Sequence, residues 1–271
     1  MLLSLLEEGN YIVYKKGEKN MKKIFCLFAI ALMACASVFA DDKPKCIDKD
    51  VNVGVFEKVV LKGSDKIIYT QGDKVSVKIH GLKEQVDAVI INQEGKTLEV
   101  SRKSSVNNGL GWKSLFRAFS NTRKDEELVI YVTSPDLTCV KLTGSGDFIV
   151  KGQVDTDNLD IYLTGSGDID FDDIICDNMI VSLVGSGDIE IDKVECVTSK
   201  IKLQGSGDVK VKQHNVRKTI LDLYGSGDID LHCSRCDEIN ANLSGSGDIT
   251  ISGEYKNVNR NKRGSGDINV R

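Results

Sequence analysis

Apolar and polar residues alternate along most of the chain after residue 40, with the period of two residues that β-strands show. The segment from Val75 to Ile79, V-S-V-K-I, is a clear example. Long runs with the helical period of about 3.6 residues are hard to find in the same part of the chain. The pattern therefore predicts an all-β protein.

The second half of the chain repeats one pattern of strands and turns. The string Gly-Ser-Gly-Asp starts seven times at intervals of 19 to 21 residues, at Gly144, Gly165, Gly185, Gly205, Gly225, Gly245 and Gly264. An apolar-x-apolar run follows the copies, and a second alternating run, such as Leu159, Ile161 and Leu163, precedes them. No segment between these runs has the room and pattern for a helix, which argues against a leucine-rich repeat.

A single short coil cannot bury its own apolar face, whereas stacked coils can. We therefore expect a parallel β-helix, a solenoid whose coils of about 20 residues have Gly-Ser-Gly-Asp corners, preceded by a more irregular β region. The final coil carries Arg260, Lys262 and Arg263 where earlier coils have apolar or small polar residues. Such charges are typical of a solenoid end that must not recruit another strand.

Four segments follow from composition and spacing. Residues 1–20 fit nothing that precedes an export signal, so they are expected to be a non-native extension with the true start at Met21. Residues 21–40 have the layout of a signal peptide. Residues 41–143 are expected to form the irregular β region, with a short helix or loop near residues 111–120. Residues 144–271 hold the regular repeats, and we expect 41–271 to form one continuous domain.

The signal at residues 21–40 predicts an exported protein of the periplasm, the cell surface or the medium. Two lysines and a short apolar run lead to the cleavage site Val38-Phe39-Ala40. A rival cleavage site is Leu32-Met33-Ala34-Cys35, which resembles a lipobox and would leave a lipoprotein anchored through Cys35. No other stretch has the length and apolarity of a transmembrane span.

Composition and scattered polar residues narrow the function classes. The formal net charge is −4 and no basic block with interleaved aromatic residues occurs, so we expect no nucleic-acid binding. The three histidines, His80, His214 and His232, are far apart in the sequence, and no catalytic triad or phosphate loop is visible. A carbohydrate-cleaving β-helix enzyme needs clustered carboxylates. No odd residue breaks the repeat on one strand face, so we expect no enzyme.

The Gly-Ser-Gly-Asp string is expected to be a structural corner. Glycine adopts positive φ without strain, and a Cβ atom there would clash with the next coil. The expected corner residues are Gly144, Gly146, Gly165, Gly167, Gly185, Gly187, Gly205, Gly207, Gly225, Gly227, Gly245, Gly247, Gly264 and Gly266. Aspartate and serine commonly cap such corners by accepting backbone N–H groups.

The aspartates of the string are expected to stack in a column. Its members are Asp147, Asp168, Asp188, Asp208, Asp228, Asp248 and Asp267. Such a row repels itself unless each carboxylate accepts hydrogen bonds or shares a cation. Calcium-binding rolls use glycine and aspartate at a period of nine residues, so the period here favours the structural corner over Ca²⁺, and we expect no other cofactor.

Six cysteines remain after the signal, which makes disulfides possible in an exported chain. Cys176 and Cys196 are expected on neighbouring coils in one column, either bridged or as free thiols. Cys233 and Cys236 form a C-x-x-C turn, again bridged or free. Neither a redox motif nor a metal site fits this context.

The segment near residues 111–120 holds the only tryptophan of the chain. Trp112, Phe116 and Phe119 have the spacing of one apolar face of a short helix. We expect this face to pack on the β-helix. The alternative is an exposed contact patch for a protein partner or a glycan.

The entry segment "FEKVVLKGSDKIIYTQGDKVSVKI", the strand "GKTLEV" and the iterated "LTGSGDI" resemble one family over residues 52–271. It is the head GIN domain family of exported Bacteroidota-type proteins, labelled auto-transporter adhesins. The resemblance implies a β-helix at or outside the cell envelope and brings no catalytic residues. We therefore expect an adhesin or binding module for a protein or glycan; the alternative is an envelope scaffold that associates with itself.

Overall fold

The computed structural model describes residues 45–103 and 127–271, and Cys46–Arg271 form one compact unit. The predictions for residues 1–40, including Cys35, lie outside the described residues. The same holds for the helix or loop expected near 111–120 and for Trp112, Phe116 and Phe119.

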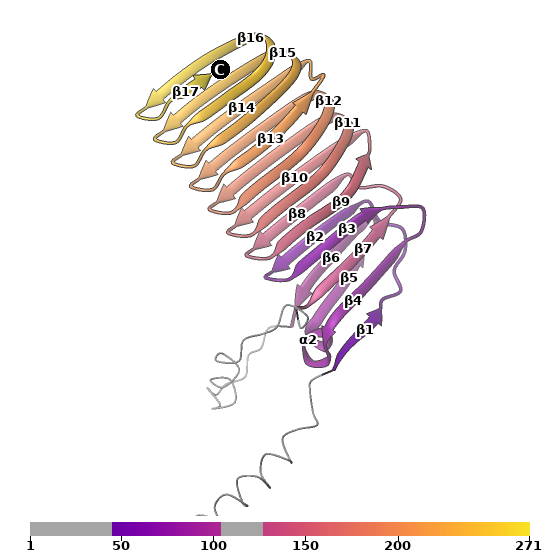
Figure 1. Ribbon diagram of the computed structural model, residues 1–271. Coiled ribbons are helices and arrows are strands. Elements are labelled where there is room, and N and C mark those ends of the chain that lie inside the picture. Colours follow the sequence, from indigo (N-terminus) through magenta and orange to yellow (C-terminus); the bar gives the residue numbers. More distant parts are fainter. Residues whose placement is uncertain (1–44, 104–126) are drawn as a thin grey trace, which may run out of the picture. The chain divides into compact units, whose positions relative to one another are not determined.

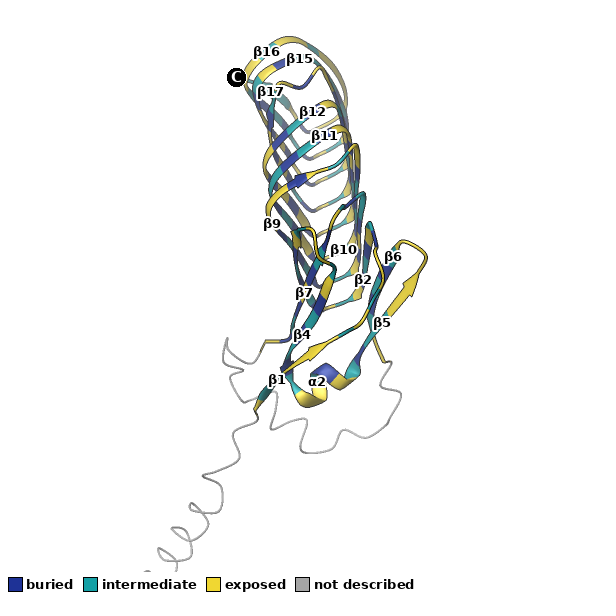
Figure 2. Ribbon diagram, turned by 90° about the vertical axis from the view of Figure 1, so that its right-hand side faces the viewer, coloured by how far each residue is buried: buried dark blue, intermediate teal, exposed yellow. Residues whose placement is uncertain are grey.

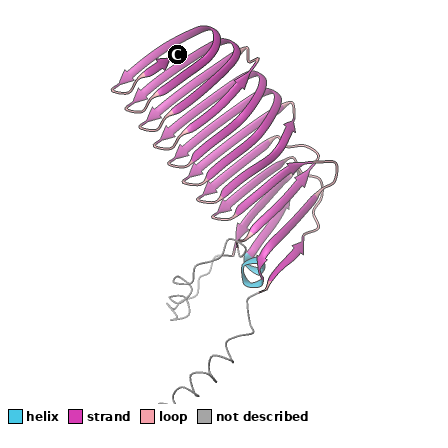
Figure 3. Ribbon diagram, in the orientation of Figure 1, coloured by secondary structure: helices cyan, strands magenta, loops and turns pink. Residues whose placement is uncertain are grey.

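Strands make up most of the described chain, with one short helix (Figure 3). In chain order the elements are β1 (Cys46–Asp50), β2 (Lys58–Gly63), β3 (Lys66–Gln71), β4 (Ser76–Leu82), α2 (Lys83–Ala88), β5 (Val89–Glu94), β6 (Thr97–Arg102), β7 (Val129–Ser134), β8 (Cys139–Gly144), β9 (Asp147–Asp155), β10 (Asn158–Gly165), β11 (Asp168–Gly185), β12 (Asp188–Gly205), β13 (Val209–His214), β14 (Lys218–Gly225), β15 (Ile229–Gly245), β16 (Ile249–Gly264) and β17 (Ile268–Val270).

The strands stack in parallel, coil upon coil (Figure 1). Long strands such as β11, β12 and β15 turn through a bend opposite the Gly-Ser-Gly-Asp corner, so each supplies both flat sides of a coil. Gly165 pairs with Gly185 and Gly185 with Gly205, which keeps the corners in exact register along the stack. The predicted parallel β-helix is confirmed.

The core lies between the two sides of the coils and consists of columns of like side chains (Figure 2). From β10 to β15 one column is a ladder of five leucines with at most 2% of their surface exposed, namely Leu163, Leu183, Leu203, Leu223 and Leu243, and it continues through Leu142 and Leu61 in the preceding coils. Burial of each such side chain contributes about 2 kcal/mol. Because alternate residues point inward, the period-two pattern of the sequence becomes one continuous apolar interior.

Three polar side chains interrupt the apolar core, which corrects the expectation that nothing breaks the repeat. The buried Gln213 amide donates to Ser199 Oγ at 2.7 Å and accepts from Thr219 Oγ1 at 2.7 Å. Gln213 lies on one side of the coil, and the two hydroxyls lie on the other. The three groups satisfy one another, so they form a closed internal network and no outward-facing site.

The stacked coils begin before the first Gly-Ser-Gly-Asp string, so the start placed at residue 144 moves to β2. Strands β2 and β3 pair in parallel with β8 and β9, with Gly63 opposite Gly144 and Lys66 opposite Asp147. The sequence hides this coil because Asp65 stands where later corners have their second glycine. No coil lies beneath it there, so a side chain has room.

The corner of this first coil is closed by an ion pair. The buried Asp65 carboxylate accepts from Arg102 Nε at 2.6 Å and also contacts the second arm of that guanidinium. Its Oδ2 atom is buried without a hydrogen-bond partner. Arg102 ends β6, the strand that pairs beneath β2. The pair therefore covers the position that a preceding coil would fill.

The N-terminal strands extend both sides of the stack with mixed pairing. β1 and β7 pair antiparallel with β4, and β5 pairs antiparallel with β6. The helix α2 connects β4 to β5 and buries only Val86. It was not predicted, because six residues are too few for a helical period to stand out. The expectation of a more irregular β region agrees with this part of the structure.

The last full coil differs from the others in its inward positions. Arg260 pairs with Ala241 and Lys262 with Leu243, so charged residues occupy the two columns that are apolar in β15. Lys262 Nζ also bonds to Asp267 at 2.6 Å. Within residues 45–103 and 127–271, no helix is long and apolar enough to cross a membrane.

Candidate functional site

The Gly-Ser-Gly-Asp corners stack so closely that both glycines touch the preceding coil. The first glycine has positive φ, 134° at Gly165, and a Cβ atom there would lie 2.1 Å from the Gly144 carbonyl oxygen. The second glycine lacks positive φ, yet a Cβ on Gly187 would lie 1.9 Å from the Gly167 carbonyl oxygen. The carbonyl of each first glycine instead accepts a hydrogen bond from the N–H of the corner serine in the next coil. The distance from Ser186 N to Gly165 O is 2.9 Å.

The corner aspartates form a column joined by hydrogen bonds between coils. Asp168, Asp188, Asp208, Asp228 and Asp248 each accept, through Oδ1, the N–H of the aspartate in the next coil, at 2.7 to 3.2 Å. The two end members differ, because Asp147 bonds to Lys66 at 3.5 Å and Asp267 to Lys262. The carboxylates therefore cap the neighbouring coil rather than their own corner.

A small acidic groove of about 180 Å³ lies beside this column. Its walls are Asp168, Asp170, Asp188, Ile189, Glu190, Asp208 and Lys210. Burial raises the pKa of the Asp170 carboxyl, and the charges of Glu190 and Asp168 raise it further. Among the described residues, no three histidine, cysteine or acidic side chains are placed to hold a metal ion together.

The structure holds the four predicted cysteines as buried free thiols. Cys176 and Cys196 face each other on neighbouring coils, and a hydrogen bond between their thiols raises the pKa of Cys196. A bond to Cys236 raises the pKa of Cys233 in the same way. The thiol hydrogen bonds place the members of each pair next to one another.

The bend opposite the glycine corner varies from coil to coil. In the first regular coils its charges are paired between neighbours, with Lys151 bound to Asp172 at 3.0 Å and Lys212 to Asp192 at 2.6 Å. Two residues of β12 lie opposite one residue of β13 between Ile191 and Val194, which is a β-bulge. From β13 onward the bend therefore has a different shape.

After this bulge, the bend takes a left-handed backbone conformation. Asn215 has φ 57° and Arg235, one coil later, has φ 63°; they are the only residues other than glycine with positive φ in the described chain. Asn215 is held by its N–H to the Ser234 carbonyl at 3.0 Å and by its side chain to Glu195 at 3.0 Å. Non-glycine residues in this conformation are strained and cluster at functional sites.

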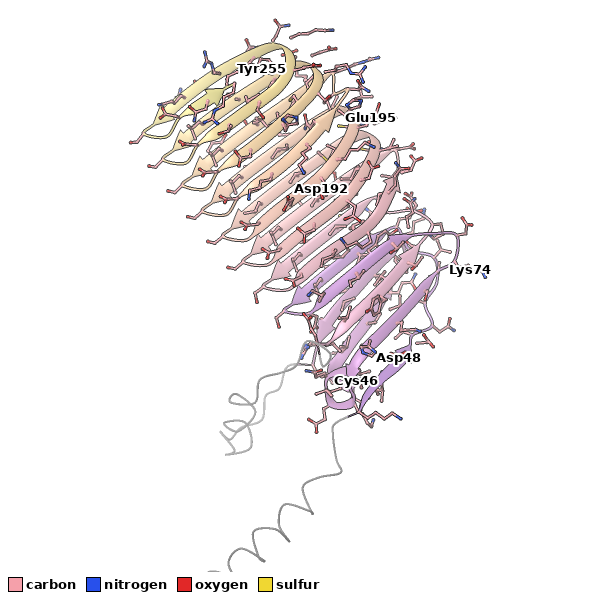
Figure 4. All side chains as sticks on the ribbon, viewed as in Figure 1. Cys46, Asp48, Lys74, Asp192, Glu195 and Tyr255 are labelled. Atoms are coloured by element: carbon pink, nitrogen blue, oxygen red, sulfur yellow. The ribbon has the colours of Figure 1, made fainter. Side chains whose placement is uncertain are left out.

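A cleft of about 470 Å³ opens at this bend, lined by three successive coils. The lining segments are Asn215–Arg217, Arg235–Asp237 and Glu254–Lys256. Tyr255, labelled on the last full coil in Figure 4, is partly buried in the lining. We call this site the bend cleft.

The charges of the bend cleft are only partly paired. Lys256 Nζ bonds to Asp237 at 2.7 Å, and Arg235 contacts His214 Nε2 at 3.0 Å. Among the described residues, neither the Arg217 guanidinium nor the Glu254 carboxylate has a hydrogen bond or ion pair. The cleft thus presents two guanidinium groups without a carboxylate partner.

Sequence reasoning missed the bend cleft, although one of its residues, Cys236, was singled out. Two features of the sequence could have indicated the cleft. One is the C-x-x-C turn around Arg235, and the other is the segment before Asn215, which is one residue shorter than the matching segment of β12. The histidines lie at the surface: His80 is bonded to Asp48 at 2.6 Å, His232 to Ser252 at 3.1 Å, and His214 lies two residues from His232 in register on the neighbouring coil.

A family model matches the chain over residues 55–254 and again over 197–271. Its description is "Putative auto-transporter adhesin, head GIN domain". The two matches together span well over half of the chain, so the protein belongs to this family, as the sequence predicted. Among the curated proteins, none matches the chain.

Solved structures with the same fold come from Bacteroides and Parabacteroides species. A "putative adhesin" from Bacteroides fragilis is 24% identical, with a TM-score of 0.66, and the match covers 84% of this chain and 98% of that chain. A "putative lipid binding protein" from Parabacteroides distasonis is 22% identical, with a TM-score of 0.65 and coverages of 84% and 97%. A "putative adhesin" from Parabacteroides merdae is 17% identical, with a TM-score of 0.60 and coverages of 84% and 96%. At these identities the likeness establishes the fold.

Proposed function

We propose that this protein is a non-catalytic binding module of the cell envelope or cell surface, an adhesin whose ligand contacts lie at the bend cleft. The observation that carries the proposal is the cleft itself, a concave site with converging polar groups and one aromatic ring on a scaffold of stacked strands. Its partner is a protein or glycan of the envelope or of a neighbouring cell.

The architecture suits presentation of a ligand site rather than catalysis. Parallel backbone pairing joins the three coils that line the cleft on both of their flat sides, and it is interrupted only at the bend itself. The carboxylates of the corner column are engaged with backbone N–H groups. A carbohydrate-cleaving activity is the least favoured function, because it needs two carboxyl groups acting together across a cleft, and of the two in the bend cleft Asp237 is paired with Lys256.

A self-associating envelope scaffold is the second candidate function, since open solenoid ends can pair with another copy. The charged positions Arg260 and Lys262 on the last full coil oppose this by placing cations where a further coil would seek apolar partners. Light scattering on the purified protein separates the two functions. A distribution of long polymers supports the scaffold, and monomers or small oligomers support the binding module.

Export of the protein is part of the proposal and rests on residues 21–40 together with the family. We expect cleavage after Ala40 and release as a soluble protein. N-terminal sequencing of the mature protein tests this, and palmitate labelling that is lost on Cys35→Ala would establish the lipoprotein form instead.

The binding function is tested with an array of glycans and extracellular-matrix proteins probed with the labelled mature protein. We expect at least one immobilised ligand to be bound, and its signal to fall at least fivefold in the double variant Arg217→Gln, Arg235→Gln. Arg263→Gln, which removes an exposed guanidinium elsewhere on the last coil, is the matched control. Equal signals from all three proteins would place the ligand contacts elsewhere and refute the assignment to the bend cleft.

A further inference from the structure

We propose that the bend cleft binds an oxyanion, the carboxylate or sulfate group of an acidic saccharide, between the guanidinium groups of Arg217 and Arg235. This proposal rests on the binding function proposed above and names the chemical class of its ligand. It concerns a site that lies on the bend side of the coils, away from the aspartate column.

Charge pairing along the bend differs between the cleft and the coils before it. Three lysines of the preceding coils, Lys151, Lys193 and Lys212, each bond to an aspartate of a neighbouring coil at 2.6 to 3.0 Å. At the cleft this pairing is incomplete. Lys256 still bonds to Asp237 at 2.7 Å, but the Arg217 guanidinium has no partner in the described chain and Arg235 contacts a histidine ring instead of a carboxylate. Two guanidinium groups that line one concavity without a bonded carboxylate leave an anion-binding position open.

Arg235 is carried by a backbone segment with an unusual conformation. Arg235 adopts φ 63°, although an arginine avoids this conformation in an ordinary strand. The preceding coil stacks Asn215 in the same conformation and fixes it through Ser234 and Glu195. This backbone departs from the strand alternation at the position where the guanidinium joins the cleft. The strain is thus maintained by the fold at the site of the unpaired charge.

The residues that line the bend cleft match the chemistry of an acidic saccharide. A guanidinium is planar and donates two parallel hydrogen bonds to a carboxylate or sulfate, which makes arginine the preferred residue for such groups. The partly buried ring of Tyr255 offers an apolar flank for a sugar ring, while its hydroxyl donates to the Arg271 carbonyl at 3.5 Å. The Glu254 carboxylate remains available to accept hydrogen bonds from sugar hydroxyls. Together these groups match a saccharide that carries one acidic substituent.

Binding of an anionic ligand must come from the cleft and not from the overall charge of the protein. The formal net charge of the chain is −4, so a polyanion is not attracted by the molecule as a whole. Binding of an acidic saccharide therefore requires a local cationic site. The affinity for the saccharide should fall as the salt concentration rises. At physiological ionic strength the attraction between exposed charges is already largely screened beyond about 8 Å.

The experiment is calorimetric titration of the mature protein with three probes. Oligogalacturonate carries carboxylates, dextran sulfate carries sulfates, and unmodified dextran is the neutral control. We expect binding of at least one anionic probe and none of dextran. Arg217→Gln and Arg235→Gln should each weaken that binding at least fivefold, and the double variant more than thirtyfold. Arg263→Gln and Lys200→Gln, which remove exposed cations outside the cleft, should change it less than twofold.

A variant that keeps the charge sharpens the result. Arg217→Lys should recover only part of the lost affinity, because an ammonium lacks the planar pair of donors. Unchanged melting temperatures of all variants show that the fold is intact. Absence of binding to both anionic probes, or equal weakening by Arg263→Gln, overturns the oxyanion proposal. If the array still shows a ligand that is lost with the Arg217→Gln, Arg235→Gln variant, the binding function stands and only the ligand class is wrong.

Discussion

The two ends of each coil follow different rules. At the Gly-Ser-Gly-Asp corner the backbones of successive coils touch, and a Cβ atom at Gly185 or Gly187 would lie 1.9 Å from a carbonyl oxygen of the preceding coil. At the opposite bend the backbones of neighbouring coils also meet, since a Cβ on Gly253 would lie 2.0 Å from the Cys233 carbonyl oxygen, but the pairing register shifts there between β12 and β13 and between β15 and β16. The Gly-Ser-Gly-Asp corner repeats its glycines because a larger residue does not fit there. The opposite bend is free to vary in sequence.

This difference shows where function can be placed on a solenoid. A corner fixed by backbone contact cannot gain new side chains without loss of the stack. The bend tolerates a bulge, two left-handed residues and a cleft of about 470 Å³. The most repeated motif of the sequence is therefore structural, whereas the candidate binding site lies where the repeat is least regular.

The largest expected effect is that of alanine at the glycine corner. Gly187→Ala should destabilise the fold by about 4 kcal/mol or more, because its Cβ would overlap the Gly167 carbonyl oxygen. Urea denaturation followed by circular dichroism measures this loss.

The matched control for this variant is Gly63→Ala, at the corner of the first coil. Gly63 has φ 134° but no atom within 4 Å of the added Cβ position. Only backbone strain remains there, about 1 to 3 kcal/mol. A loss for Gly187→Ala no larger than that for Gly63→Ala would show that coil contact is not what demands glycine.

The next effect concerns the ion pair that closes the first coil. Arg102→Ala should cost about 3 kcal/mol, because it leaves the Asp65 carboxylate buried without its cation. The double variant Asp65→Gly, Arg102→Ala restores the glycine of the later corners and should recover most of the loss. Thermal unfolding of the two variants makes the comparison, and an equal loss in both would contradict the role given to the pair.

A smaller effect is expected inside the core. Gln213→Leu should cost about 2 kcal/mol, because the buried hydroxyls of Ser199 and Thr219 lose their partner. Replacing both hydroxyl residues by valine in the same chain should restore stability, since the site then becomes apolar throughout. Chemical denaturation tests this, and a triple variant less stable than the single variant would show that the network contributes more than mutual satisfaction.

The smallest effect concerns the acidic groove beside the glycine corner. Burial and the nearby Glu190 and Asp168 raise the pKa of Asp170, so its charged form destabilises the folded state. Asp170→Asn should stabilise the protein at pH 7 by roughly 0.5 kcal/mol, since solvent screens this half-exposed group.

The pH dependence of that gain has a definite sign. The stabilisation should be complete above the folded pKa and vanish as pH falls below the usual aspartate value of 3.8, where both states are protonated. Melting temperatures between pH 3 and pH 7 measure it. A gain that grows on acidification would contradict the assigned direction.

Much of the fold could be predicted from the sequence because stacking imposes the same residue requirements on every coil. Each coil must place its glycines under the same carbonyl groups, so the string from Gly144 to Gly264 reveals the coil length and the parallel pairing. Alternation of apolar residues reveals the inward columns, such as the leucine ladder from Leu163 to Leu243. The extra coil at β2 escaped because Asp65 interrupts the glycine pattern at a place where no contact enforces it.

The solenoid, the position of its corners and the family could all be read from the order of the residues. Which charges are paired depends on the three-dimensional fold, since Lys212 and Asp192 meet across coils whereas the Arg217 guanidinium meets no carboxylate. The fold also creates the bend cleft, which depends on a one-residue shift between β12 and β13 and on the left-handed backbone of Asn215 and Arg235. The physical reason is that stacking contacts repeat with the sequence, whereas a cleft arises from the spatial sum of three unlike coils.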